Sequence, residues 1–174
     1  NFRATPLMID GVLYSPNAIG LVEAFHPGTG KTIWVQEPFR DEPGQGLRGD
    51  STRGVTYWTD GAERRLFLVR GEYLIALDPR TGKLLTSFGD KGRVNLRPGL
   101  GPRATKYAWT GVPQVCRDVV IVGTGIGGSV RRALGQAAVD VPSDTAARRS
   151  RQRHVGERLV GVQRRGEPVV ADHR

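Results

Sequence analysis

Two segments of the chain, 52 residues apart, carry nearly the same sequence. Ala24–Trp34 reads AFHPGTGKTIW, and Ala76–Thr86 reads ALDPRTGKLLT. Thr29 and Thr81 occupy equivalent places in the two copies, so the period is 81 − 29 = 52 residues. A fixed period of roughly 20 to 50 residues is typical of solenoids, propellers and arrays, in which one supersecondary unit recurs. The repeat therefore predicts a fold that is assembled from copies of one unit.

The unit itself has the pattern of four short antiparallel strands. Apolar runs alternate with turn signals through residues 2–128, and Asp10-Gly11 is a strong hairpin signal between two such runs. The first unit is expected to have two strands within Pro6–Tyr14 and one each over Leu21–Phe25 and Thr32–Gln36. The strands expected after it are Val55–Trp58, Arg65–Val69, Tyr73–Leu77 and Lys83–Phe88 in the second unit, and Val112–Cys116 and Val119–Val122 at the start of a third.

A radial array of such units is a β-propeller. Four-stranded blades around an axis leave only short, protected sheet edges, whereas a β-sandwich would not produce the period. We therefore predict an all-β fold, in which residues 1–128 form a partial β-propeller of about two and a half four-stranded blades. The connections 37–52 and 90–106 are expected to be loops between blades on one rim, where ligands bind.

Each residue type in the repeated segment has a mechanical use. The small Ala24 and Ala76 let neighbouring sheets approach closely. Asp and Thr side chains can cap the tight turn, and Gly supplies a backbone conformation that other residues avoid. Trp34 is expected to lie flat between adjacent sheets, where the ring adds apolar contact and the indole N–H adds a donor.

The repeated segment resembles the tryptophan-docking motif of the quinoprotein dehydrogenases, eight-bladed propellers that use pyrroloquinoline quinone (PQQ). His26 replaces the motif's Asp in the first copy, and Thr86 replaces its Trp in the second. RGVTYW at Arg53–Trp58 and YAWTGVPQVCRDVVIVG at Tyr107–Gly123 resemble the branch that oxidises glucose and alcohols. The resemblance extends through residues 1–128 and implies a fragment of the propeller.

The resemblance also implies which residues contact PQQ. The arginine of the family's RGV segment, which reaches the quinone carboxylates or carbonyls, is Arg53, and a threonine that contacts the same cofactor is Thr110. A planar guanidinium suits a ligand with three carboxylates. The alternative for Arg53 is an ion pair at the blade rim with Asp50 or Glu72, and the alternative for Thr110 is an ordinary strand hydroxyl.

The implied parent oxidises an alcohol or sugar by passing hydride to PQQ, with calcium polarising the quinone. The family's catalytic aspartate and most calcium ligands belong to later blades, so no catalytic and no metal-binding residue is assigned in this chain. Alcohol-oxidising members carry a calcium-binding glutamate near the place of Gly128. The fragment alone is expected to be inactive and to bind neither cofactor.

The resemblance implies a periplasmic location, or an inner-membrane one facing the periplasm, and allows a membrane electron acceptor. It does not predict the oligomeric state. The main alternative from another class is a cofactor-free scaffold propeller of the bacterial envelope, because such propellers share the docking motif. The RGV segment with Arg53 favours the enzyme.

A glycine pattern offers a third interpretation. Val119–Gly128 reads VVIVGTGIGG, which places Gly123, Gly125 and Gly128 in Gly-x-Gly-x-x-Gly spacing after a strand. If Ser129–Val139 formed a helix, this would be the outline of a dinucleotide-binding βαβ unit. Such a unit normally opens its domain, whereas here no strand–helix alternation follows, so this interpretation is the weakest of the three.

The residues after 128 differ in composition from the rest. Residues 129–174 hold ten Arg, no Lys and five Asp or Glu, which is +5 of the chain's net charge of +9. No aromatic residue is present there for base stacking, so nucleic acid is not an expected partner. We expect this Arg-rich tail to be disordered or to be the product of a shifted reading frame.

The frameshift hypothesis rests on hidden motifs. Val130–Pro142 can be encoded so that its second frame reads FDARSGKLLWTFH, a further docking motif. The hidden Ser-Gly-Lys begins near Leu134, and 134 − 81 = 53 keeps the period. Arg158–Val170 likewise permits DSWEYSGAANPWS, which resembles a later quinoprotein segment.

The cysteine count, the length of the apolar runs and the first residue limit the class of protein. The single cysteine, Cys116, excludes an internal disulfide framework and a Cys-rich zinc site, and its apolar surroundings predict a buried structural thiol. No run approaches the ~20 apolar residues of a membrane-spanning helix. The chain begins at Asn1 without an initiator Met or a signal peptide, so we expect a piece of a longer protein.

Overall fold

The computed structural model describes residues 4–38, 53–98, 106–109, 111–127, 134–140 and 159–160 of the 174. Every helix or strand assigned within these ranges is a β-strand, and the strands pair antiparallel into three sheets that follow one another along the chain. The all-β prediction is therefore confirmed for the described residues.

The first sheet has the four strands expected from the sequence. Asp10 and Gly11 connect the first two with φ of 49° and 77°, and positive φ at both central residues is the hairpin geometry that Asp-Gly favours. In order, the strands are β1 (Leu7–Ile9), β2 (Val12–Pro16), β3 (Val22–Phe25) and β4 (Thr32–Val35).

The second sheet corrects one expectation. Its strands are β5 (Thr56–Thr59), β6 (Arg64–Arg70), β7 (Tyr73–Leu77) and β8 (Arg93–Asn95), so the fourth strand is not Lys83–Phe88. The connection 90–106, expected to be a loop, therefore contains β8.

The chain leaves the second sheet after Leu84, which makes only an isolated bridge to Leu77. Phe88 then turns into the core, where 1% of its surface is exposed. Gly89, Lys91 and Gly92 have positive φ, and they reverse the chain so that it returns to β7 as β8. Burial of one aromatic ring thus overrides the strand pattern of residues 83–88.

The third sheet consists of β9 (Lys106–Trp109), β10 (Gln114–Cys116), β11 (Val119–Gly127), β12 (Leu134–Asp140) and β13 (Leu159–Val160). β11 is its centre, because β10 and β9 pair with successive parts of one side and β12 pairs with the other. The sheet continues beyond residue 128, where the sequence placed the end of the propeller. The interpretation of the later residues as a disordered tail or a frameshift product stays a prediction.

The dinucleotide interpretation is wrong. Gly123 and Gly125 lie within the extended strand β11, and Gly125 pairs with Ala108 on one side and Leu134 on the other. A glycine inside a ladder cannot form the tight turn that wraps a pyrophosphate. Leu134–Asp140, which overlaps the segment that would have been the helix, is a strand, and Gly128 lies outside the described residues.

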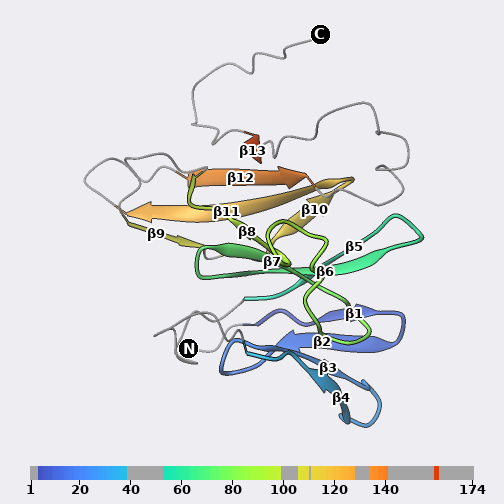
Figure 1. The fold of residues 1–174 in the computed structure, drawn as a ribbon. Helices are drawn as coiled ribbons and strands as arrows, with labels where there is room; N and C mark the ends of the chain where they lie inside the picture. Colours follow the sequence, from blue (N-terminus) through green and yellow to red (C-terminus); the bar gives the residue numbers. More distant parts are fainter. Residues whose placement is uncertain are drawn as a thin grey trace.

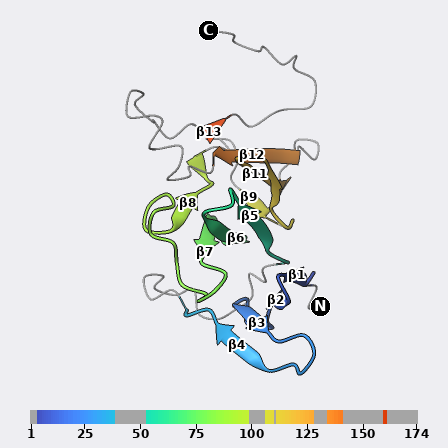
Figure 2. The same cartoon turned by 90° about the vertical axis from the view of Figure 1, so that its right-hand side faces the viewer.

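The three sheets stack face to face in chain order, as adjacent blades of a partial propeller do (Figures 1 and 2). One apolar core fills the space between the first and second sheets, with Tyr14, Val22, Ala24, Val55, Leu66, Leu68, Ile75 and Leu77. A second core lies between the second and third sheets, with Trp58, Phe67, Val69, Leu74, Ala76, Phe88, Leu96, Val120, Val122 and Val139.

β6 connects the two cores, because alternate side chains of a strand point to opposite faces. Leu66 and Leu68 belong to the first core, and Phe67 and Val69 to the second. The same alternation explains why Cys116 is exposed, against the expectation of a buried thiol: its neighbour Val115 packs on the core, so Cys116 lies on the opposite face.

Candidate functional site

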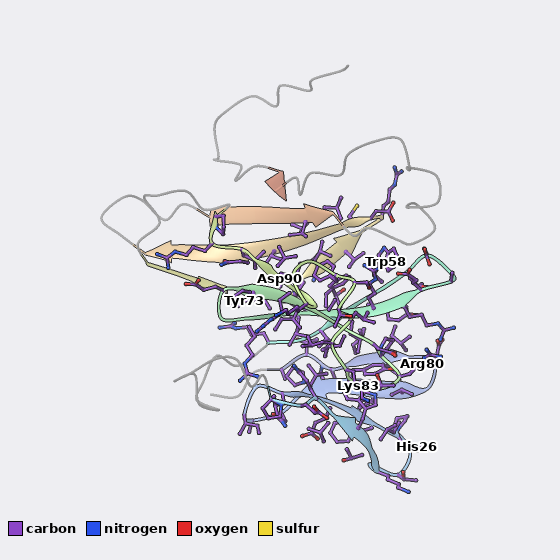
Figure 3. All side chains as sticks on the ribbon, in the orientation of Figure 1. His26, Trp58, Tyr73, Arg80, Lys83 and Asp90 are labelled. Carbon is purple, nitrogen blue, oxygen red and sulfur yellow. The ribbon has the colours of Figure 1, made fainter. Side chains whose placement is uncertain are left out.

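The two copies of the repeat form turns with the same hydrogen bonds. In the first, Gly30 N donates to His26 O (2.8 Å) and His26 N donates to Lys31 O (2.9 Å). In the second, Gly82 N donates to Asp78 O (2.8 Å) and Asp78 N to Lys83 O (2.9 Å). Figure 3 labels His26 in the first turn and Arg80 and Lys83 in the second. The repeat is therefore a structural one.

The capping roles expected from the sequence are confirmed. Thr29 Oγ1 accepts a hydrogen bond from the N–H of Lys31, and Thr81 Oγ1 accepts one from the N–H of Lys83. Asp78 Oδ1 adds a bond from Arg80 N at 2.8 Å. These bonds satisfy backbone donors that the tight turn would otherwise leave unpaired.

Trp34 docks the first sheet onto the second, as predicted. Its indole Nε1 donates to the carbonyl of Pro79 at 3.0 Å. Its ring lies directly on Gly82, since a Cβ built at Gly82 would be 2.4 Å from Trp34 Cε3. Ala24 and Ala76 are both fully buried, which leaves room for this close approach. The repeated segment thus serves packing between blades.

The second copy of the repeat lacks a tryptophan, and the contact between the second and third sheets uses a tryptophan from another strand. Thr86, which stands where the motif has Trp, is exposed. Instead, Trp58 of β5 is buried and donates from Nε1 to the carbonyl of Arg117, in the β10–β11 turn, at 3.0 Å. The guanidinium of Arg65 lies over the Trp58 ring, 5.1 Å from its centre. This contact joins the second sheet to the third.

The segments that lead into β1, β5 and β10, one in each sheet, lie close together. Arg53 lies beside them. Thr5 N donates to Arg53 O at 2.8 Å, and Thr5 and Gly54 form a parallel bridge. A Cβ at Gly54 would be 2.8 Å from Cγ2 of Val112, which precedes β10. Only glycine fits there, so the first residues of three neighbouring blades converge around Gly54.

The Arg53 side chain is exposed at this convergence. Glu72, one of the two carboxylates considered as its partner, bonds Arg97 instead, at 3.0 Å. Asp50, the other, and Thr110 lie outside the described residues.

Neither a metal cluster nor a membrane helix is found in the described part of the chain. Those residues contain no group of three or more His, Cys, Asp or Glu that could hold a metal ion. Among them, too, no helix is long and apolar enough to cross a membrane.

Comparison with known proteins identifies the family. The family model described as the β-propeller domain of PQQ-dependent glucose, ethanol and alcohol dehydrogenases matches residues 1–140. The chain belongs to this family. The quinone-dependent alcohol dehydrogenase subunit of Gluconacetobacter polyoxogenes is 34% identical over 129 residues, which are 71% of this chain and 16% of that protein. The glycerol dehydrogenase large subunit of Gluconobacter thailandicus is 32% identical over 132 residues, 69% of this chain and 17% of that protein.

Solved structures of the PQQ dehydrogenase family show the same fold. The crystal structure of the quinohemoprotein alcohol dehydrogenase from Comamonas testosteroni superposes with a TM-score of 0.58 at 25% identity. The match covers 81% of this chain and 19% of that one. The chain thus spans less than a fifth of each of these three relatives, and the activity of a whole dehydrogenase is a matter for proposal.

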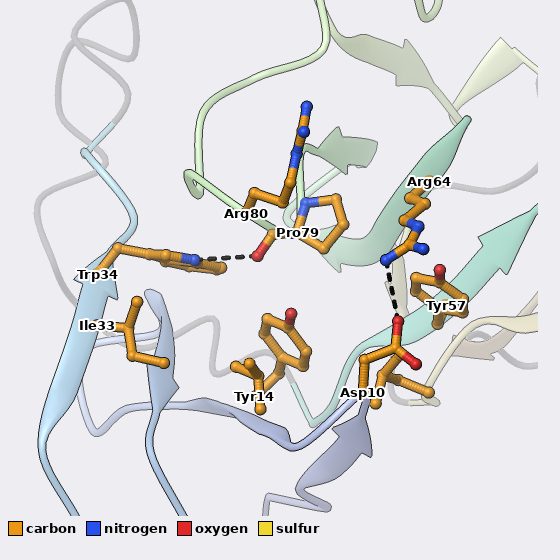
Figure 4. A pocket seen from close by; sticks show the side chains of 10 residues that line it. Asp10, Tyr14, Ile33, Trp34, Tyr57, Arg64, Pro79 and Arg80 are labelled. Atoms are coloured by element: carbon orange, nitrogen blue, oxygen red, sulfur yellow. Dashed lines mark hydrogen bonds and ion pairs between the residues drawn. The ribbon is translucent and has the colours of Figure 1, made fainter. Parts of the chain in front are cut away.

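A pocket between the first and second sheets was not anticipated from the sequence. It has a volume of about 260 Å³ and is lined by Ile9, Asp10, Val12, Tyr14, Ile33, Trp34, Tyr57, Arg64, Pro79 and Arg80 (Figure 4). Its residues come from five separate segments, so no local pattern marks it. Asp10 and Arg64 form an ion pair of 2.9 Å across the two sheets at one side.

Folding raises the pKa of Tyr14, which lines this pocket. Burial raises the pKa of its hydroxyl above the ordinary value of 10.0, and the negative charge that Tyr57, Asp10 and Asp78 carry when ionised adds to this. The neutral phenol is therefore the form that the folded chain favours.

This shift predicts a pH dependence of stability. Because the folded state holds the Tyr14 proton more tightly than the unfolded state does, the contribution is complete below pH 10 and is lost as the pH rises beyond it. The unfolding free energy of Tyr14→Phe should fall less steeply above pH 10 than that of the unmodified chain, as measured by urea titration at several pH values. Parallel curves for the two proteins above pH 10 would contradict the shift.

Proposed function

We propose that this chain is part of a PQQ-dependent dehydrogenase that oxidises an alcohol or sugar. The observation that carries the proposal is the position of Arg53, an exposed guanidinium at the convergence of three blade entries, within a chain whose residues 1–140 match this family. The names of the relatives, which are alcohol, glycerol and glucose dehydrogenases, support the substrate class.

The chemistry of Arg53 fits the cofactor. PQQ carries three carboxylates, and a guanidinium offers five donors in a planar fork that pairs with carboxylates. Glu72 is engaged by Arg97, so the described residues leave the Arg53 fork available to a ligand. When bound, PQQ would accept the hydride from the substrate carbon. We assign Arg53 and Thr110 to holding and orienting it, and we place the catalytic base and the calcium ligands outside this chain.

The role of Arg53 is tested in the full-length protein reconstructed around this segment, because the segment alone is expected to bind no cofactor. We expect Arg53→Ala to weaken PQQ binding about tenfold, since a charge-assisted hydrogen bond is worth ~1.5–3 kcal/mol. Equilibrium dialysis with absorbance detection of PQQ would measure it. Arg97→Ala is the matched control, because Arg97 is also an exposed arginine but is paired with Glu72. Equal affinities for the two variants would contradict the assignment.

The dehydrogenase activity of the full-length protein needs a different experiment. The gene would be reconstructed around this segment, and the product assayed with PQQ, calcium and a redox dye on alcohols and glucose. Oxidation of an alcohol or of glucose supports the proposal, and the preferred substrate shows whether the enzyme belongs with the alcohol-oxidising or the glucose-oxidising members. A folded product that neither binds PQQ nor turns over any substrate would favour the cofactor-free scaffold propeller. We place the dehydrogenase in the periplasm or on the periplasmic face of the inner membrane, as the resemblance of its docking motif to the quinoprotein dehydrogenases implies.

We further propose that the residues after about 129 derive from a shifted reading frame. The hidden docking motif near Leu134 and the Arg-rich composition support this. The family model matches up to residue 140, so we place the change of frame between residues 129 and 140. Sequencing the coding DNA tests the proposal: a second frame that reads on through propeller motifs supports it, and stop codons in that frame refute it.

A further inference from the structure

One face of the first sheet is apolar and open. The core between the first and second sheets takes the other face, and the first sheet lies at the end of the stack (Figure 1). Residues paired across neighbouring strands point to the same side of a sheet. The open side, which we call the outer face, therefore carries two rows of residues. The rows are Met8, Leu13 and Phe25, and Ser15, Glu23 and Val35. Met8 is 56% exposed and Val35 is 46% exposed.

The repeat shows what covers the corresponding face of the second sheet. At the spacing of 52 residues, Phe25 corresponds to Leu77. Their partners across the ladder, Leu13 and Leu66, correspond likewise. Leu66 and Leu77 are fully buried, in the core that the first sheet covers. The outer face is thus the equivalent of a face that a neighbouring sheet buries. The matched segment is 16% of the Gluconacetobacter polyoxogenes subunit, which leaves enough residues for a further sheet.

The centre of the outer face is polar, unlike its counterpart. Glu23 stands where the second sheet has Ile75, at the same spacing of 52 residues. Ser15, opposite Glu23, stands where the second sheet has Leu68. Both Ile75 and Leu68 are buried. A sheet that covered the outer face would therefore bury a carboxylate where the first and second sheets bury a branched alkyl chain. Burial of a charge is costly unless the charge meets an opposite one.

The carboxylate of Glu23 has a neutral partner. Its Oε1 accepts a hydrogen bond from Asn17 Nδ2 at 2.6 Å. Asn17 is itself held in place, because its Oδ1 accepts from the backbone N–H groups of Ile19 and Leu21. Among the residues that the structure describes, no Lys, Arg or His forms an ion pair with Glu23. The carboxylate is thus oriented by Asn17, and its charge is uncompensated within the described part of the chain.

We propose that a further sheet of the longer protein covers the outer face and presents an arginine or lysine to Glu23. The apolar residues of the outer face pack against that sheet, and the cation bonds the Glu23 carboxylate. The cores of the two described interfaces between sheets are apolar, so this third interface is distinguished by an ion pair. Only a sheet with the matching cation fits it. This inference does not depend on the proposed function, since it involves neither PQQ nor a substrate.

Oxidation of Met8 tests whether the outer face is covered. Met8 is the single methionine of this chain, and oxidation by hydrogen peroxide follows exposure. The experiment uses the full-length protein reconstructed around this segment, with Lys83→Met as an internal reference. Lys83 is exposed in a turn of the second sheet, which already has a neighbour on each face. We expect Met8 to be oxidised at least about tenfold more slowly than the reference, as measured by peptide mass spectrometry.

Two results of the oxidation experiment would overturn the proposal. Equal rates for Met8 and the reference methionine would mean that the outer face stays open. Protection of Met8 that appears only as the protein concentration rises, together with a dimer in sedimentation, would mean that a second copy covers the face instead of a sheet of the same molecule.

Glu23→Gln tests the cation. The amide keeps the shape of the side chain and removes its charge, so the opposing cation would be left buried without a partner. We expect Met8 to be oxidised about tenfold faster in this variant, because the covering sheet opens more often. Glu37→Gln is the matched control, since Glu37 is exposed just after β4, and it should leave the rate unchanged. Circular dichroism verifies that both variants are folded. The same Met8 rate in the two variants would refute the ion pair.

Discussion

Gly82→Ala should lower the free energy of unfolding by about 3 kcal/mol, the combined cost of a left-handed backbone for alanine and of overpacking. Gly82 has a φ of +69°, and its added Cβ would lie 2.4 Å from Cε3 and 2.7 Å from Cζ3 of Trp34. The indole is held by its hydrogen bond to Pro79, so it cannot move aside without losing that bond. The blades would have to separate slightly, which would loosen the first core.

Gly30→Ala is the matched control, because Gly30 holds the same place in the first copy of the repeat. Its φ is +68°, but nothing lies within 4 Å of an added Cβ. Only the backbone cost of about 1 kcal/mol is expected there. Urea unfolding followed by circular dichroism would give both values. A loss at Gly82 no larger than the loss at Gly30 would show that Trp34 does not pack on the turn as described.

Phe67→Ala should cost about 3–5 kcal/mol, the range for deleting a fully buried aromatic ring. Phe67 has no exposed surface and meets the ring of Phe88 edge-on, with the two centres 5.2 Å apart. Burial of Phe88 takes the chain out of the second sheet before β8. Because Phe67 packs on Phe88, it should also stabilise this path of the chain. The loss is a large part of the ~5–15 kcal/mol that stabilises an ordinary domain.

Ile33→Ala provides the comparison for Phe67. Ile33 lies in β4 with 51% of its surface exposed, so its truncation should cost less than about 1 kcal/mol. The urea midpoint of each variant is the measurement. A small loss for Phe67→Ala would mean that the second and third sheets are not joined by the core described above.

The sequence predicted the local parts of the molecule well. Asp10-Gly11 predicted the first hairpin, since that dipeptide adopts positive φ readily, and the docking segment predicted the flat contact of Trp34 with its neighbouring sheet. The same reasoning failed at Lys83–Phe88 and Cys116. At both places the local pattern is apolar. Phe88 is buried because it packs on Phe67 of another strand, whereas Cys116 lies on an open face of its sheet and is exposed.

Of the two candidate sites, the sequence marked one and only the structure revealed the other. The resemblance of the RGV segment marked Arg53 from the sequence, and the structure added that three blade entries converge beside it. The pocket between the first and second sheets had no signal in the sequence, because Tyr14, Trp34, Tyr57 and Arg80 come from different strands and turns that meet only when two blades pack.

By itself, the sequence determined the family, the repeating four-stranded unit and the turns that end its strands. The turns depend on interactions within a few residues, and the repeat period can be read from the sequence alone. Tertiary structure alone decided that Phe88 leaves the sheet, that Trp58 bonds the turn before β11, and that an aromatic pocket lies between the first two blades. Those features depend on contacts between sheets, and such contacts exist only once separate blades have come together.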